Sequence, residues 1–449
     1  MCLPNARWRR APFVHWSAFL FLPACDVRCQ GSTGCKNGGR RAVLVVCLVR
    51  LGAAPQPRHH GDHSRQQQTM IVQSAMNMTS ASKHTLAGVL AKSSRRCWMR
   101  VRSKEWWERV VLKDFSDAEW RDTFRMSRAS FHKLCGLMDG LLRSEARTVR
   151  APIPLPMRVA IVLYKLAGCA RYKVVGVHKC TVINFVYSFC KGMTSSAIHA
   201  LISVPTAAEA RRIAHGFQRK SNIPQILGCI GGTHVPVLPP GDSFKEFTNR
   251  EGWPSCVLQA VVDDTYGFWN INCKMPGGAH DAKVLKQSAL FALAHHLPKE
   301  PREISRTTVN LFLLGDPAYP LLDWLIKDYV RSPNMTPEQE SFNAYLSSAR
   351  TTVEIAFGRL KSRWKVLLQR SDFHYTFTPH VVATCCALHN FCENESINPA
   401  WIDEAAVLEQ ELPQPGMSWY HAADCADGQT VRLALTEYLK SNFPLRRHE

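Results

Sequence analysis

The sequence lacks any apolar run close to the roughly 18 residues that a membrane-spanning helix needs. It also lacks Cys-x-x-Cys pairs and the Cys/His spacings of zinc sites, although it contains 17 cysteines. An odd number of scattered cysteines is typical of buried thiols in a reducing compartment. These absences argue against an integral membrane protein, a zinc-binding module and a disulfide-rich secreted protein.

Acidic residues are scarce. Asp and Glu number 36 against 56 Lys and Arg, which gives a net charge of +20. Residues 1–100 contain 15 Lys and Arg against 2 Asp, so +13 of this charge lies there and +7 in residues 101–449. An excess of positive charge favours a polyanionic partner, nucleic acid first and an acidic membrane second. We therefore expect a DNA partner and a location in the nucleus, with the cytoplasm as a second location.

We interpret residues 1–98 as a basic, unstructured leader, because positive charge there accompanies polar and glycine-rich clusters. A short apolar stretch at residues 11–24 loosely resembles a secretory signal, but His15, Trp16 and Ser17 interrupt it. A leader produced by faulty gene prediction is an alternative explanation of this segment.

Residues 99–220 predict a helical domain, because their apolar residues recur at helical spacing and Ser116 and Glu119 have the spacing of a capping box. Between Tyr172 and Val182, a short helix, a glycine-containing turn and a second helix outline a helix-turn-helix. A plain helical core segment is an equally good interpretation, since the same apolar residues would be buried in either case.

Residues 221–395 predict a mixed α/β domain, and residues 396–449 a C-terminal tail with a short helix. The expected elements, in order, are strands at 225–237, 256–262 and 268–274, a helix at 281–296, a strand at 309–314 and a helix at 341–368. The second and third strands flank a turn-rich link typical of an antiparallel hairpin. A hairpin followed by helix, strand and helix describes a layered α/β architecture.

Two acidic residues stand where α/β domains bind ligands. Asp316 follows the apolar strand at 309–314, at its C-terminal end. Glu354 lies on the long helix in a polar row with Arg350 and Lys361, along the edge of a buried stripe. Both have simpler interpretations: Asp316 as a local cap, and Glu354 as the salt-bridge partner of Arg350 four residues earlier.

Several stretches match a known family in the right order. They are Gly228–Pro236, Met275–Asp281, Leu314–Tyr319, Arg350–Trp364 and Leu388–Phe391, with Phe124–Ser127 and Gly176–Thr181 in the helical part. Together they resemble PIF/Harbinger-type DDE transposases and the nucleases derived from them, over about residues 105–395. The resemblance implies an RNase H-like fold behind an all-α, helix-turn-helix-like domain. It also implies divalent-metal-dependent cleavage or transfer of DNA strands.

In this family three acids hold Mg²⁺ or Mn²⁺, and the ions activate water and stabilise the leaving oxygen. By position, Asp316 matches the second acid and Glu354 the third, while the first falls on Gly231, which has no ligand atom. Asp281 matches a motif that accompanies the first acid, so it is a secondary candidate ligand that could instead cap its own helix. His234 more often satisfies a backbone group than binds a metal.

Loss of the first acid predicts a protein that keeps the nuclease fold but has impaired catalysis. The alternative is a non-catalytic nuclear factor that reuses the transposase scaffold to bind DNA or protein.

Lys179, Lys361 and Arg363 are candidate contacts to DNA phosphates, although cations at helix ends are also common without such a role. Relatives in the family resemble proteins that work with a separate Myb-like DNA-binding protein. The resemblance therefore implies such a partner for this chain, and it leaves a homo-oligomer open.

Overall fold

The computed structural model describes residues 104–142, 152–168, 177–370, 373–395, 413–416 and 425–446. The leader predicted for residues 1–98 and the Tyr172–Gly176 part of the expected helix-turn-helix lie outside these described residues. None of the described helices combines the length and the apolar character that crossing a bilayer requires.

Five strands form a mixed sheet in the order β3-β2-β1-β6-β7. Their bounds are β1 Ile226–Pro236, β2 Ser255–Val262, β3 Phe268–Pro276, β6 Phe312–Leu314 and β7 Leu325–Ile326. β1, β2 and β3 are antiparallel neighbours, while β6 runs parallel to β1 and β7 parallel to β6. A mixed sheet flanked by helices confirms the predicted α/β class, and it is consistent with the expected RNase H-like domain.

β1 is much longer than its parallel neighbour β6. On one side it pairs with β2 from Cys229 to Pro236, whereas on the other side its pairing with β6 ends where Cys229 meets Leu314. Residues 230–236 therefore have a partner strand on one side only. This unpaired edge of β1 is where the polar residues of the domain gather.

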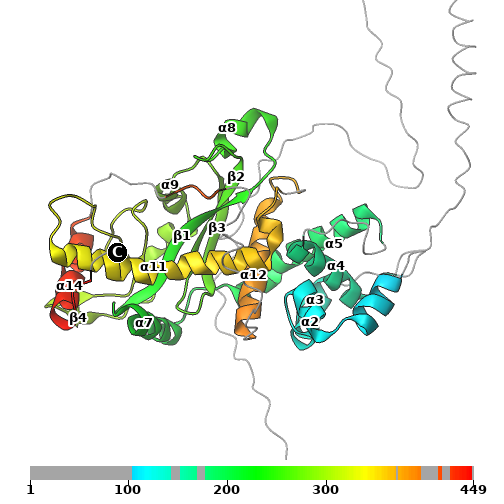
Figure 1. Cartoon of the computed structure of the whole chain (residues 1–449), viewed down its shortest axis with the longest axis horizontal. Coiled ribbons are helices and arrows are strands. Elements are labelled where there is room, and N and C mark those ends of the chain that lie inside the picture. The colour runs from blue at the N-terminus through cyan, green and yellow to red at the C-terminus, as the bar shows by residue number, and fades with distance from the viewer. Residues whose placement is uncertain are drawn as a thin grey trace, which may run out of the picture. The chain divides into compact units, whose positions relative to one another are not determined.

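Helices cover both faces of the sheet. α7 (Ala207–Ser221) packs Ala210 and Ala214 against Leu227 and Ile230 of β1, on the face that α9 (Asp281–Lys286) and α10 (Ala289–Ala292) also cover. α11 (Pro337–Arg363) and α12 (Thr378–Asn394) cover the opposite face, and Figure 1 shows α11 crossing in front of β1. α7 thus packs on the sheet, although nearly all of it lies in the segment 99–220 that was predicted as the helical domain.

α11 begins and ends at clear local signals. Thr336 forms a capping box with Gln339, and Pro337 occupies the first turn, where its missing N–H costs no hydrogen bond. The helix ends at Arg363 and a separate 3₁₀ turn, η5, follows at Lys365–Leu367. The expected helix at 341–368 was therefore placed correctly but begins earlier and ends sooner.

Two other expected elements are divided in the structure. The helix expected at 281–296 is three short pieces, α9, α10 and the 3₁₀ turn η4 (Ala294–His296), because Ser288 caps α10 by accepting a hydrogen bond from Phe291 N. The strand expected at 309–314 is divided between β6 and β5 (Thr307–Val309), which pairs with β4 (Arg302–Ile304) in a separate ribbon.

The N-terminal described part is helical, as predicted. Its elements are η1 Trp106–Asp114, α2 Asp117–Phe124, α3 Arg128–Leu142, α4 Leu155–Gly168, α5 Lys179–Gly192, η2 Met193–Ala197 and α6 Ile198–Leu201. Ser116 and Glu119 form the predicted capping box on α2. Trp120 packs edge-on against Phe131, with ring centroids 5.2 Å apart. α5 and α6 contact α12, so one continuous core joins these helices to the sheet domain.

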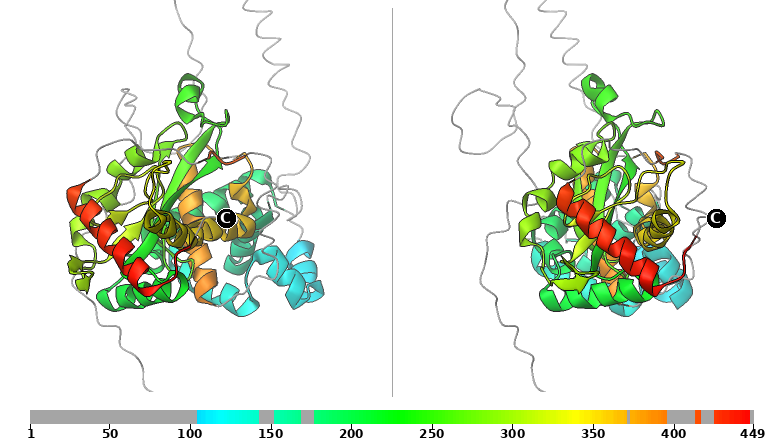
Figure 2. Two further views of the ribbon diagram at one scale, coloured as in Figure 1. Left: turned by 60° about the vertical axis from the view of Figure 1, so that its left-hand side comes forward. Right: turned by 90° about the vertical axis from the view of Figure 1, so that its left-hand side faces the viewer.

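The C-terminal tail contains α14 (Ala426–Asn442), where only a short helix was predicted. Figure 2 shows α14 in front of the sheet domain, and it contacts α11 and β7. Lys440 Nζ lies 3.5 Å from Glu338 Oε1 at the start of α11.

Asn390 on α12 joins two distant parts of the chain. Its Oδ1 accepts a hydrogen bond from Phe268 N at 2.8 Å, and its Nδ2 donates to Phe268 O at 2.6 Å and to Leu201 O at 2.8 Å. The neighbouring His389 is fully buried and its Nε2 donates to Tyr266 O at 3.0 Å. Both side chains therefore form hydrogen bonds within the core.

We expect Asn390→Ala to lower the free energy of unfolding by on the order of 3 kcal/mol, because the buried Phe268 N–H loses its acceptor. Urea denaturation measures the change. Asn394→Ala is the matched control on the exposed end of the same helix, with an expected effect within about 0.5 kcal/mol. Equal losses in the two variants would contradict this assignment.

Candidate functional site

A cavity of about 590 Å³ opens beside the unpaired edge of β1. Its lining includes polar and glycine residues of β1, the start of α9, the loop after β6, and α11: Gly231, Gly232, Asp281, Asp316, Arg350, Glu354 and Lys361. Segments that are far apart in the sequence thus meet at one cavity. Asp316, Glu354, Asp281 and Gly231 all line this cavity.

Asp316 stands directly after Gly315, at the carboxyl end of β6. Its Oδ1 accepts a hydrogen bond from Ala318 N at 2.8 Å, so the carboxylate also caps the local turn. Burial and, to a smaller extent, the nearby carboxylate of Asp281 raise the pKa of Asp316 to about 7, although Arg350 opposes the rise. Asp316 therefore exchanges its proton near neutral pH.

Asp281 is the first residue of α9 and faces the cavity. The cap of this helix is His280, whose Nδ1 accepts a hydrogen bond from Ala282 N at 3.2 Å, so the interpretation of Asp281 as the cap is wrong. A Cβ added at Gly232 would lie only 2.8 Å from Asp281 Oδ1. Because glycine has no side chain, position 232 leaves room for the Asp281 carboxylate. Burial raises the pKa of Asp281.

Arg350 supplies the positive charge of the cavity. Its Nη2 donates to Glu354 Oε1 at 2.6 Å, and the Arg350 side chain is 9% exposed against 59% for Glu354. Burial lowers the pKa of Arg350, but the carboxylates of Asp316, Glu354 and Asp328 outweigh this effect and hold it above its ordinary value. The simpler interpretation of Glu354, as the salt-bridge partner of Arg350, is confirmed.

The space beside Gly231 is occupied by side chains of α11. A Cβ added at residue 231 would lie 3.1 Å from both Cγ atoms of Val353 and 3.5 Å from Phe357 Cε2. These contacts are tight, so an aspartate at this position requires Val353 to move. Position 231 faces α11, while position 232 faces Asp281 on the other side of the sheet.

The donor set does not fit the two-metal site that the resemblance implies. Gly231 contributes no ligand, and an oxygen of Glu354 is bound by Arg350. Within the parts of the chain that the structure describes, no three His, Cys, Asp or Glu side chains are grouped to hold a metal ion. A two-metal mechanism needs a carboxylate between the ions. Gly231, at the position that the resemblance gives to the first acid, has no carboxylate.

The three predicted phosphate contacts have different environments. Arg363 is fully buried, with Nη2 2.9 Å from Glu393 Oε1 and Nη1 2.9 Å from His389 Nδ1, so its prediction as a DNA contact is wrong. Lys361 is 2% exposed and donates to His234 O at 3.2 Å, and burial lowers its pKa to about 7. The Lys361 ammonium can therefore contact a ligand group only if that group enters the cavity. Lys179 is exposed at the start of α5 and remains a prediction.

His234 has structural partners. Its Nδ1 lies 2.9 Å from the Ser255 hydroxyl, and burial lowers its pKa to about 4, with Lys361 and Arg250 adding to the effect. The partner of the ring is a side-chain hydroxyl, where a backbone group was predicted.

Sequence reasoning missed the residues at the mouth of the cavity, Arg250 and 414–416. They approach the site from the loop after α8 (Phe244–Phe247) and from the C-terminal tail. No local pattern marks them, because their position depends on contacts between segments more than 150 residues apart.

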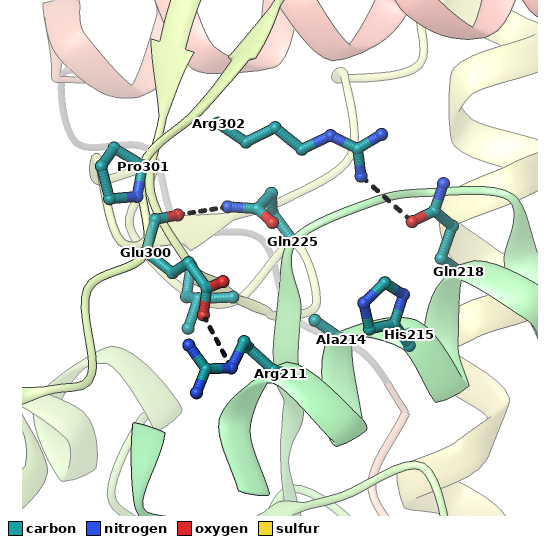
Figure 3. A pocket seen from close by; sticks show the side chains of 9 residues that line it. Arg211, Ala214, His215, Gln218, Gln225, Glu300, Pro301 and Arg302 are labelled. Carbon is teal, nitrogen blue, oxygen red and sulfur yellow. Dashed lines mark hydrogen bonds and ion pairs between the residues drawn. The ribbon is translucent and has the colours of Figure 1, made fainter. Parts of the chain in front are cut away.

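A second cavity lies near the beginning of β1 (Figure 3). Its volume is about 210 Å³, and its lining includes Arg211, His215 and Arg302. Arg211 Nε lies 3.8 Å from Glu300 Oε2, and Arg302 Nη1 donates to Gln218 Oε1 at 3.2 Å. Because α/β sheets place ligands at the carboxyl ends of parallel strands, the cavity beside Asp316 is the better candidate.

The acid-lined cavity lies in a recognisable domain. Residues 230–390 match the DDE superfamily endonuclease family. This DDE match includes Gly231, Asp281, Asp316 and Glu354, and the superfamily usually uses divalent metals. The chain is also similar to Protein ALP1-like from Arabidopsis thaliana, which is 29% identical over 311 residues, or 64% of this chain and 75% of the relative. No solved structure matches the chain.

We expect Arg350→Met to lower the free energy of unfolding by on the order of 3 kcal/mol at pH 8, because buried acids lose their counter-charge. Asp316 has a raised pKa in the folded state, so it costs stability as pH rises from its unfolded value near 4 through about 7. The loss should therefore be smaller at pH 5, where Asp316 stays protonated.

Glu354→Gln is the matched control for Arg350→Met. It breaks the same ion pair but keeps the cation, and Glu354 is 59% exposed, so we expect a change below about 1 kcal/mol. Denaturant titrations at pH 5 and pH 8 measure both variants. A loss for Arg350→Met that does not depend on pH would contradict the coupling to Asp316.

Proposed function

We propose that this chain is a transposase-derived DNA-binding protein of the PIF/Harbinger type, with an RNase H-like DDE scaffold and impaired metal-dependent cleavage. The observation that carries the proposal is glycine at position 231, with Val353 and Phe357 packed against it. The scaffold around this position is retained: the sheet order, the long helix α11 and the convergence of Asp316 with Glu354.

The impairment follows from the missing acid. Two divalent ions about 4 Å apart need a carboxylate that binds both. Loss of a residue that merely orients a metal ligand costs about 10–100-fold in affinity or activity, so loss of a ligand should cost more. The Arg350 guanidinium already neutralises part of the acidic charge in the cavity. Asp316 and Asp281 can still accept hydrogen bonds or exchange protons there.

DNA binding is supported by charge. The chain carries +20 overall, and its exposed cations include Arg250, which borders the cavity, Lys283 on α9, whose first residue borders the cavity, and Lys274 on β3. Sequence-independent contacts of this kind go to phosphates. The family resemblance extends the proposal to a nuclear location and to a separate Myb-like protein that supplies sequence specificity.

Restoring the first acid tests the proposal. We expect the unaltered protein to cut supercoiled plasmid DNA little with Mg²⁺ or Mn²⁺. The double variant Gly231→Asp, Val353→Ala should gain metal-dependent cutting by more than about tenfold, because it supplies the carboxylate and removes the Cγ atoms that would meet it. Gly231→Asp alone should gain less.

Asp316→Ala in the double variant is the control and should abolish the gained cutting. Circular dichroism and thermal unfolding establish that each variant is folded. Strong cutting by the unaltered protein that Asp316→Ala abolishes would overturn the proposed impairment.

DNA binding is tested by its salt dependence. The logarithm of the association constant for duplex DNA should fall with the logarithm of salt concentration, by about 0.9 for each phosphate contact. Lys179→Gln should reduce this slope by about one contact. Lys440→Gln on α14, where the side chain pairs with Glu338, is the matched control and should leave the slope unchanged. Absent or salt-independent binding would favour a protein-interaction role.

A further inference from the structure

Residues 413–416 lie across the mouth of the acid-lined cavity. Gln414 Oε1 accepts hydrogen bonds from Thr233 Oγ1 at 3.0 Å and from His234 N at 2.9 Å. Trp253 Nε1 donates to Pro413 O at 3.0 Å, and Arg250 Nη2 donates to Gly416 O at 2.8 Å. Four hydrogen bonds, from β1 and from the loop after α8, hold this Pro-Gln-Pro-Gly segment.

These contacts satisfy the backbone of one residue, His234, on the unpaired edge of β1. The His234 N–H donates to Gln414, and the His234 carbonyl accepts from Lys361 Nζ at 3.2 Å. Two side chains therefore take the backbone groups that a neighbouring strand would otherwise bind. An unpaired strand edge readily accepts another chain segment, and here the segment comes from the same molecule.

The segment also lines the site itself. Gln414, Pro415 and Gly416 border the same cavity as Asp316 and Glu354. Two prolines flank Gln414, and each has a fixed φ, so the segment loses little conformational entropy when it is held. The hydrogen bonds to Gln414 and Gly416 connect residues at least 166 positions apart in the sequence.

We infer that residues 413–416 form an intramolecular strap that blocks the candidate site and must be displaced before a polynucleotide can enter the cavity. The inference rests on the proposed function for the identity of the entering ligand. The strap itself is independent of that function. Release of the strap breaks the hydrogen bond between Arg250 and the Gly416 carbonyl, so that the Arg250 guanidinium can contact a phosphate instead.

Gln414→Ala tests the strap because it removes the acceptor of two hydrogen bonds. Val353→Cys places a thiol at a buried position of the cavity lining, and its labelling by a maleimide, followed by peptide mass spectrometry, reports access to the site without DNA. We expect Gln414→Ala to raise this labelling rate by about tenfold, since two hydrogen bonds of ordinary net strength are lost.

Two further variants provide an independent test and a control. Trp253→Phe removes the N–H that holds Pro413 O and should raise the labelling rate in the same direction, by a smaller factor. Gln429→Ala, at an exposed position on α14, is the matched control and should leave the rate unchanged. Equal labelling rates in the unaltered, Gln414→Ala and Trp253→Phe backgrounds would overturn the strap.

A DNA titration of Gln414→Ala without the added cysteine then separates the two proposals. Faster labelling together with tighter binding of a duplex oligonucleotide supports the strap as a regulator of DNA access. Faster labelling with no DNA binding by any variant supports the strap and overturns the proposed DNA-binding function. Tighter DNA binding without faster labelling would contradict a strap over the cavity.

Discussion

The buried guanidinium of Arg350 is the constraint on which the candidate site depends. It stands on α11 among three carboxylates, those of Asp316, Glu354 and Asp328, which together hold its pKa above the ordinary value despite burial. Uncompensated acids in such a cavity would repel one another and would take up protons. In this chain a fixed cation performs part of the charge neutralisation that metal ions perform in a DDE nuclease.

The packing of α11 on β1 decides what position 231 can do. Val353 and Phe357 take the space that a side chain at 231 would need, while Glu354 on the same helix faces the cavity. One row of α11 residues, which includes Val353 and Phe357, is therefore buried in the hydrophobic core, and the neighbouring row, which includes Glu354, lines the cavity. A change in the chemistry of the site is therefore also a change in core packing, which links any regained activity to the volume of Val353.

Much of this arrangement could be predicted from local patterns. The turn-rich link between two strands predicted the hairpin of β2 and β3, and helical spacing predicted α11 and its polar row. The division of 281–296 into short helices was missed because the Ser288 cap competes with continued helix formation. The spacing of apolar residues indicates a helix, but it does not show where a capping residue divides that helix. Arg363 was misplaced because a cation near a helix end has the same local pattern whether it is exposed or buried.

The sequence by itself determined the candidate residues: the family resemblance predicts Asp316 and Glu354 as site residues and places Gly231 at the position of the first acid. Only the tertiary structure decided how those residues are used. The pairing of Arg350 with Glu354, the burial of Lys361 and the contacts of 413–416 with β1 depend on which segments meet at one strand edge. Such contacts are set by the packing of distant segments, which no short stretch of sequence records.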